Sequence, residues 1–536
     1  MHKPTFSPDK TPNLLLIAMM AIGASCLDKM HGFDVMQAGA ELSNFLAWHL
    51  RWEIFSDYHF RPPAKLWVFQ ALLLLELYEK MYSTRALHER AHIHHATTIT
   101  LMRRGSSLIG RSALDSPPSV RDDKQGMNGS RHSSASGANT PDEWWIHWIT
   151  NEATRRAAFA AFVIDSTHAT MFGHSTVMVA HEMRLPLPCD ETLWNATNSA
   201  EVGRIEASLH ANGVKPISFL EGLKRTLNGQ EVRTNSFGRT ILMAGLLSVS
   251  WHMNQRDLQV NSLGVSQALG GRDKWRGSLT RAFDLWKTDF DRSLSRKTEN
   301  VPTPYVYTDK RADNILFESR TVLHHLAHMA MHVDIVDCQI FARAKRLLGR
   351  TIGSQDLNSA QRRMKDNWAP TAKARDATWY ALRFLCAVLL PEESPSSTGS
   401  YGDISLSLPF TYSARDDVLL NRPWVLYFAV LIVWCYGFAL EGPCTSPIPS
   451  AYDFDEQVRD MRSYLRRLGG VRSPEDLKAM HGFNGCSGML MVLRTTFEKT
   501  RWELLHEAAL LLNNCIQLIG GHAQQGQGQA QGQGQS

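Results

Sequence analysis

The chain has 536 residues, 43 % hydrophobic and 20 % charged, which is enough to bury a large core over roughly two to four domain-sized units. Its 57 basic and 52 acidic residues give a net charge of +5 that is spread along the whole length, so composition gives no electrostatic case for direct nucleic-acid binding. The eight cysteines never form a C-x2-C or C-x4-C pair, which excludes a locally built zinc finger or zinc ribbon.

The first hundred residues repeat apolar side chains at three- and four-residue steps. This spacing predicts helices over 13–27, 35–56, 64–82 and 85–102, and we expect residues 1–102 to form an N-terminal helical part. Residues 103–141 are rich in Ser, Gly, Arg, Asp and Asn and nearly free of aromatic side chains. Such a segment cannot bury enough apolar surface to become ordered, so we expect a disordered linker.

His88, Glu89 and His92 form a literal HExxH pattern within the fourth predicted helix. Two histidines one turn apart could ligate zinc, and the glutamate could act as a general base on the bound water. A zinc metallopeptidase is therefore one alternative for this chain. Arg90 inside the pattern, His95 where the longer metzincin pattern has Gly, and the linker that follows all count against it.

A tryptophan-rich helix opens the central part of the chain, which we expect to be a helical core over residues 142–390. Trp145, Trp148 and Ile149 share one face, and Phe159 and Phe162 continue this apolar surface in later turns.

The same helix carries charges at helical offsets. Glu152 is placed to pair with Arg155 and Arg156 at i,i+3 and i,i+4, and Asp165 follows at a later polar position. A phosphate contact by the two arginines is the alternative to this internal pairing.

A proline-punctuated segment follows this helix. Pro186 and Pro188 predict extended backbone, and Asp190 is placed to cap a short helix that carries Trp194. Helical spacing then recurs over 202–209, 217–227, 237–253, 274–293, 315–348, 357–390, 456–468 and 489–519. Alternating Val, Ile and Thr runs are absent, so the fold class is all-α with few or no strands.

His324, His328 and His332 recur every four residues, ahead of Asp334 and Asp337. Two of these histidines and a carboxylate could hold a metal ion. The alternative is a semi-polar helix face packed against other helices, with each imidazole bonded to a neighbour.

Residues 424–440 contain no charge and reach the short limit for a membrane span. Pro423 and Gly442 would equally bound a buried core helix, and no second span or basic flank accompanies the segment. We expect the core helix, with a membrane-associated protein as the alternative. Around it we expect a linker at 391–405, a C-terminal helical part at 406–519 and a Gly/Gln tail at 520–536.

The stretch over residues 144–194 resembles the middle homology region of fungal-specific zinc-finger transcription factors. The matching residues are Trp145, Trp148, Ile149, Glu152, Arg155, Arg156, Phe159, Phe162, Asp165, 185–189, Glu191 and Trp194. Residues 2–6, 14–23, 323–334 and 422–440 resemble the same family in order and spacing. The branch with two-cysteine two-histidine fingers is the most similar.

The resemblance implies a nuclear, non-enzymatic regulatory domain that acts on transcription by RNA polymerase II, with secondary-metabolite or pigment genes among the targets of some members. It implies that DNA binding and zinc belong to an N-terminal module, which this chain lacks. It leaves room for co-regulators or the transcription machinery, a small-molecule effector and a homodimer as partners, and it assigns no cofactor, catalytic residue or membrane contact to these residues.

Overall fold

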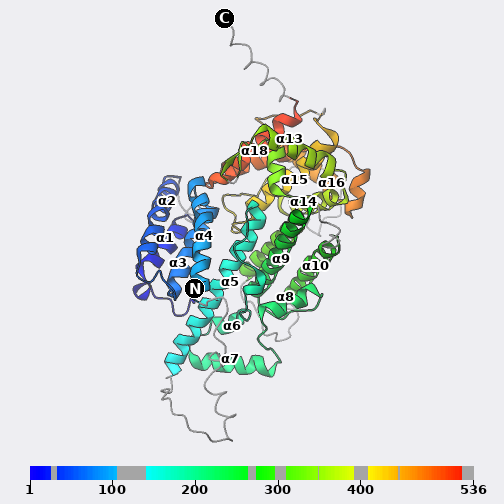
Figure 1. Ribbon diagram of the computed structural model, residues 1–536. Helices are drawn as coiled ribbons and strands as arrows, with labels where there is room; N and C mark the ends of the chain where they lie inside the picture. Colours follow the sequence, from blue (N-terminus) through cyan, green and yellow to red (C-terminus); the bar gives the residue numbers. More distant parts are fainter. Residues whose placement is uncertain are drawn as a thin grey trace. The chain divides into compact units, whose positions relative to one another are not determined.

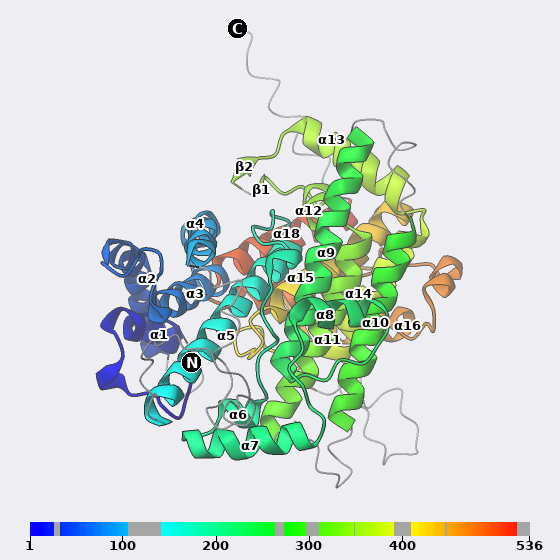
Figure 2. The same ribbon diagram turned by 60° about the horizontal axis from the view of Figure 1, so that its bottom comes forward.

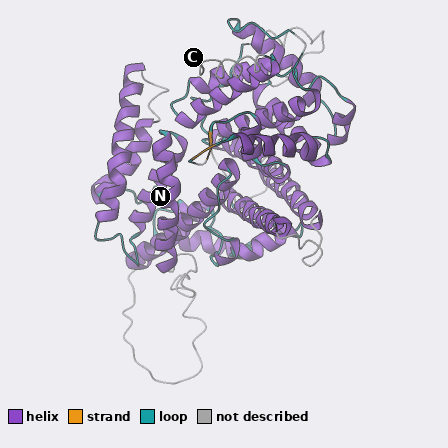
Figure 3. Cartoon of the chain, turned by 45° about the horizontal axis from the view of Figure 1, so that its top comes forward, coloured by secondary structure: helices purple, strands orange, loops and turns teal. Residues whose placement is uncertain are grey.

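The computed structural model describes residues 1–25, 33–105, 141–262, 273–295, 310–347, 349–390, 409–444 and 447–521. These residues are predominantly helical, which confirms the predicted all-α class, and they include one sheet of two very short strands. The strands are drawn in orange in Figure 3. Most of the linker predicted at 103–141, the linker at 391–405 and most of the tail at 520–536 lie outside the described residues.

The chain forms two compact units. The first comprises Met1–Tyr78, Ala91–Thr167 and Thr176–Leu316, and the second comprises Glu79–Arg90, His168–Ser175 and Phe317–Ser536. Four helices are divided between the two units: α3 (Leu66–Met81), α4 (Arg85–Arg104), α5 (Pro141–Phe172) and α11 (Lys310–His332).

The first unit contains the helices that surround the tryptophan-rich segment. Its further helices are α1 (Asn13–Ser25), α2 (Phe33–Ser56), α6 (Glu191–Trp194), α7 (Ser199–Ala211), α8 (Phe219–Leu227), α9 (Ser236–Ser262) and α10 (Asp273–Ser295). The short helix α8 is capped by Ser218, whose side chain accepts from the Glu221 amide, and it buries Phe219 and Leu223. Because its apolar face is strongly one-sided, α8 packs against both α9 and α10 (Figure 1).

The second unit contains the larger part of α11, from Phe317 onward. It also contains α12 (Ile335–Phe341), α13 (Ser354–Arg362), the π-helical turn Arg363–Trp368, α14 (Ala372–Leu389), α15 (Arg422–Glu441), α16 (Phe454–Gly469), α17 (Ser487–Glu498) and α18 (Glu503–Ile519). The two strands, β1 (Arg346–Leu347) and β2 (Arg350–Thr351), pair antiparallel as a small hairpin.

Helix α15 is the core of the second unit. Every residue from Pro423 to Gly437 is buried, and the helix packs against α12, α14, α17 and α18. Among the described residues it is the one helix long and apolar enough to cross a membrane, yet 83 % of that apolar window is buried inside the chain. The protein therefore covers the surface that a lipid would otherwise cover, as expected for a core helix.

Two predicted helices are interrupted. The segment expected over 315–348 divides into α11 and α12, because the Asp334 side chain accepts from the Val336 amide and starts a new helix. The segment expected over 357–390 divides at Pro370, after which Thr371 caps α14.

Candidate functional site

The first turns of α5 are fastened to α6 and α7 by a small hydrophobic cluster. Trp144 and Trp145 are buried against Leu193, Ala196 and Val202. Figure 2 shows α6 and α7 beside this end of α5, so the short helix that carries Trp194 lies next to the tryptophan-rich helix. The apolar face predicted from the spacing of the tryptophans is thus filled by residues some 50 positions later in the chain.

Glu152 is the polar centre of this region, and only 2 % of its surface is exposed. It accepts hydrogen bonds from Arg155 Nη1 and from Arg156 Nε, the latter at 3.0 Å, so the predicted i,i+3 and i,i+4 pairs are both present. It also accepts from the backbone amide of Cys189 at 3.0 Å. A single buried carboxylate therefore joins α5 to the proline-rich turn.

Arg156 extends the connection to α6. Its guanidinium donates to Glu191 and to the Cys189 carbonyl at 3.1 Å each, and it lies 4.5 Å from the centre of the Trp194 ring. Burial alone would lower the pKa of Arg156, but the neighbouring Glu152 and Glu191 carboxylates raise it above its ordinary value. The arginine therefore stays charged while serving as an internal tie.

Asn235 closes the network from a more distant part of the chain. Its side-chain nitrogen donates to the Cys189 carbonyl at 2.7 Å and to Glu191 at 3.1 Å. The sequence pattern did not single out Asn235, because it lies more than 40 residues beyond its partners and carries no local signal.

The proline-rich turn runs extended beside the start of α8. Leu187 donates to the Ile217 carbonyl at 2.9 Å, Phe219 donates to the Leu185 carbonyl at 3.0 Å, and Pro186 forms an isolated bridge with Ser218. Asp190 then caps α6 by accepting from the Thr192 amide, as the sequence predicts.

Near the other end of α5, Asp165 is a second buried carboxylate that joins this helix to other segments. This fully buried carboxylate accepts from the amides of Val177 and Met178 and lies 3.2 Å from His95 Nε2. The opposite nitrogen of His95 faces Glu76 at 2.9 Å, so one imidazole links two buried carboxylates. Phe159 and Phe162, predicted to be apolar, pack edge-on against the Phe219 ring in the same unit.

A pocket of about 260 Å³ lies against Glu152. Its walls come from α5, the proline-rich turn, α6, α7 and the segments around residues 214–217 and 233–234. Trp148, Glu152, Arg155, Pro186 and Pro188 of the predicted motif all line it. Four further ionisable residues line the pocket, and nothing in their local sequence spacing marks them: Glu206, His210, Lys215 and Arg233.

His88 and Glu89 of the HExxH pattern contact neighbouring residues of the fold. His88 bonds the Lys80 carbonyl through Nδ1 at 3.1 Å and packs edge-on against Phe172. Glu89 accepts from Arg85 at 3.0 Å, one turn earlier on the same helix. Within the described part of the chain, neither His88 nor His92 belongs to a group of three or more side chains arranged to hold a metal ion.

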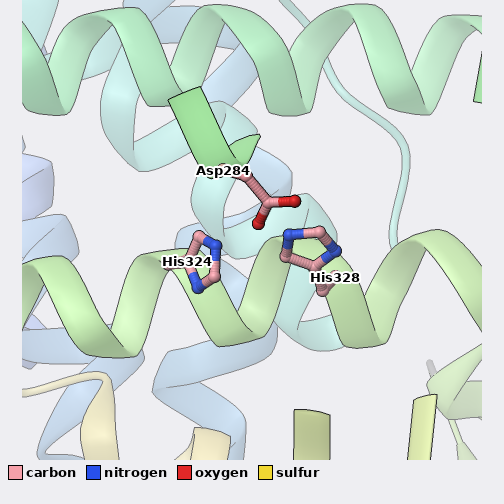
Figure 4. Close-up of side chains that lie close together, drawn as sticks. All are labelled: Asp284, His324 and His328. Atoms are coloured by element: carbon pink, nitrogen blue, oxygen red, sulfur yellow. The ribbon is translucent and has the colours of Figure 1, made fainter. Parts of the chain in front are cut away.

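His324 and His328 lie on successive turns of α11, on the same side of the helix (Figure 4). Their ring centres are 4.7 Å apart, and His328 stacks on Tyr380 at 3.8 Å. His332 takes part through its carbonyl, which accepts from the Trp368 indole at 3.0 Å. These contacts match the packed-face interpretation, and metal binding by His324, His328 or His332 stays a prediction from the sequence.

Comparison with known proteins identifies a family and relatives that cover most of this chain. Residues 1–288 match the model of the fungal specific transcription factor domain. Zinc finger protein klf1 of Schizosaccharomyces pombe is 27 % identical over 97 % of this chain and 59 % of its own length. The nicotinate catabolism cluster-specific transcription factor of Emericella nidulans is 27 % identical over 96 % of this chain and 53 % of its own.

Zinc finger protein zas1 of S. pombe is 26 % identical over 82 % of this chain and 43 % of its own length. The chain thus spans about half the length of the curated relatives it matches. No solved structure matches.

Proposed function

Since the chain belongs to the fungal specific transcription factor domain family, we propose that it is the regulatory part of a nuclear protein that controls transcription by RNA polymerase II. One observation carries this proposal: relatives named as a transcription factor and a zinc finger protein align with nearly the whole chain. The Emericella relative is named for a catabolic cluster, and we extend the proposal to control of a metabolic gene cluster, of catabolic or secondary-metabolite type.

The geometry of the candidate site supports an internal role for the motif. Arg155 and Arg156 both pair with Glu152, so these cations hold segments of the protein together instead of forming a phosphate-binding face. We therefore assign DNA recognition and zinc to a zinc-finger module of the kind for which two of the relatives are named, outside these 536 residues. Expected partners are DNA through that module, co-regulators or the transcription machinery, and a second copy of the chain.

We propose a non-enzymatic role. In the rival zinc metallopeptidase, Glu89 would be the general base, whereas here it accepts a hydrogen bond from Arg85. Metal analysis of the purified chain separates the two functions. We expect less than stoichiometric zinc; one zinc per chain that is lost in the His92→Ala variant would instead support the zinc metallopeptidase.

We also propose that the chain does not enter the membrane, because α15 is enclosed by other helices. The purified chain should remain monodisperse without detergent. A requirement for detergent that disappears when residues 424–440 are made polar would instead support a membrane-associated protein.

A tethering experiment tests the regulatory function. The 536-residue chain is fused to an unrelated DNA-binding domain and expressed in a fungal host that carries the cognate site upstream of a reporter. We expect reporter transcript to change several-fold in either direction relative to the DNA-binding domain alone. Transcript that stays unchanged, although the fusion is nuclear and intact, would contradict the proposed function.

A further inference from the structure

The pocket beside Glu152 has the dimensions of a metabolite site. Its volume of about 260 Å³ lies just below the usual range for small-molecule sites, so it suits a compact metabolite and is too small for a nucleotide or a large coenzyme. Most of its lining surface is apolar, with side chains such as Trp148, Pro186, Leu193 and Leu209. The compact body of a small organic molecule could therefore be desolvated here.

Two basic side chains at the pocket form no ion pair with the described part of the chain. Lys215 and Arg233 line the pocket, are exposed, and form no hydrogen bond or ion pair with any residue that the structure describes. His210 lines the same pocket from the end of α7. Such a group of donors favours a carboxylate ligand.

Two acidic side chains in the pocket have unused acceptor capacity. Asp190 is 5 % exposed; its Oδ1 caps α6, while its Oδ2 has no hydrogen-bond partner among the described residues. Glu206 is partly buried, and this burial raises its pKa, opposed by His210. The free Asp190 oxygen is enclosed, whereas Glu206 is partly exposed at the pocket, and a partly buried acceptor there favours a ligand that brings a hydrogen-bond donor.

From these observations we propose that the pocket binds a small carboxylic acid that also carries an amino or hydroxyl group on a compact apolar body. The carboxylate faces Lys215 and Arg233, and the donor group faces Glu206. Because Glu152 and the proline-rich turn form part of the wall, the ligand contacts the same segments that Arg156 ties together. The inference deepens the proposed regulatory function by giving it an effector class.

Calorimetric titration of the purified 536-residue chain tests this site. The probes are hydroxybenzoic and aminobenzoic acids, leucine and phenylalanine, each compared with its carboxamide. We expect at least one acid to bind with Kd below about 1 mM and its carboxamide at least tenfold more weakly. Absence of binding by every acid, or equal binding by acid and carboxamide, would overturn the proposal.

Three variants locate the binding. Lys215→Ala with Arg233→Ala should weaken the acid at least tenfold, whereas Lys224→Ala, an exposed lysine on α8 outside the pocket, should not change it. Leu209→Trp should fill the pocket and abolish binding while near-ultraviolet circular dichroism shows a folded chain. Binding that survives Leu209→Trp in the folded protein would place the acid elsewhere and overturn the site.

This result is independent of the tethering experiment. Acid binding without a reporter response would retain the site and contradict the proposed function, and a reporter response without acid binding would do the reverse.

Discussion

At the scale of single residues, the motif is an arrangement of buried charges, each of which serves several segments. Glu152 joins two arginines of its own helix to the Cys189 amide, and Arg156 continues to Glu191. Removing one member of a buried charge network leaves the others desolvated and unpaired, and that loss outweighs the modest net gain from each hydrogen bond.

Replacing Glu152 with alanine should therefore destabilise the first unit strongly. The change removes the carboxylate that two largely buried guanidinium groups and one amide share, which should lower the free energy of unfolding by about 3–5 kcal/mol. Urea unfolding followed by tryptophan fluorescence measures this effect. The matched control is Glu221→Ala, which breaks an i,i+4 pair whose partners are 43 % and 45 % exposed and should cost about 1 kcal/mol or less. Equal effects of the two changes would contradict the role of Glu152.

His2 should make the packing around Trp194 sensitive to acid. Its ring is buried edge-on against Trp145 and Trp194, and burial lowers its pKa from the ordinary 6.5, opposed by its bond to the Trp194 backbone. Because the unfolded chain then binds the proton more readily, stability contributed by neutral His2 is complete above about pH 6.5 and declines as the pH falls below it.

Unfolding midpoints between pH 5 and 7.5 measure this dependence. The His2→Phe variant has an aromatic ring at this position that cannot bind a proton. Its unfolding midpoint should therefore fall less on acidification than that of the unmodified chain. A fall of equal size in both proteins would exclude His2 as the source.

At the scale of secondary-structure elements, the core of the second unit depends on the close approach of the backbone at Phe483 to Gly437 of α15. A Cβ added at Gly437 would lie 2.5 Å from the backbone carbon of Phe483, and Tyr464 bonds the carbonyl of that same residue. A backbone neighbour cannot move aside as a flexible side chain can, so only glycine fits at this position of the helix.

Gly437→Ala should consequently destabilise the second unit by about 1–3 kcal/mol through overpacking. Thermal unfolding provides the measurement. Gly203→Ala is the control, because a Cβ on that α7 residue meets nothing within 4 Å and alanine is the better helix former, so its melting temperature should stay equal or rise. A melting temperature unchanged by Gly437→Ala would contradict the tight packing of the Phe483 backbone against Gly437.

Local spacing predicted the elements that depend on near neighbours. The helix around Trp145, the pairs of Glu152 and the cap at Asp190 all follow from offsets of two to four residues, and all three are present. The break at Asp334 was missed because the apolar pattern continues across it. Asn235 and the pocket residues Lys215 and Arg233 were missed because only the tertiary fold brings them to the motif.

At the scale of the whole molecule, the chain is an all-α member of the fungal specific transcription factor domain family that spans about half of its relatives' length. Its charge is nearly balanced and dispersed, and the arginines of its motif are held internally. These features are typical of a regulatory part and not of a DNA-reading surface.

The isolated 536 residues should accordingly bind duplex DNA weakly and without sequence preference. A fluorescence anisotropy titration with a randomised and a single-sequence duplex should give similar affinities that decline steeply with added salt, as expected for contacts to phosphate alone. Tight binding that discriminates between sequences would contradict the assignment of DNA recognition to another module.

The regulatory role itself is tested most directly by the tethered reporter, measured for the unmodified chain and for its Glu152→Ala and Glu221→Ala variants at matched nuclear abundance. We predict a several-fold change in transcript that is kept in the Glu221 variant and lost in the Glu152 variant, because the network around Arg156 holds the motif in its folded form. A transcript level equal to that of the DNA-binding domain alone for all three proteins would contradict the account.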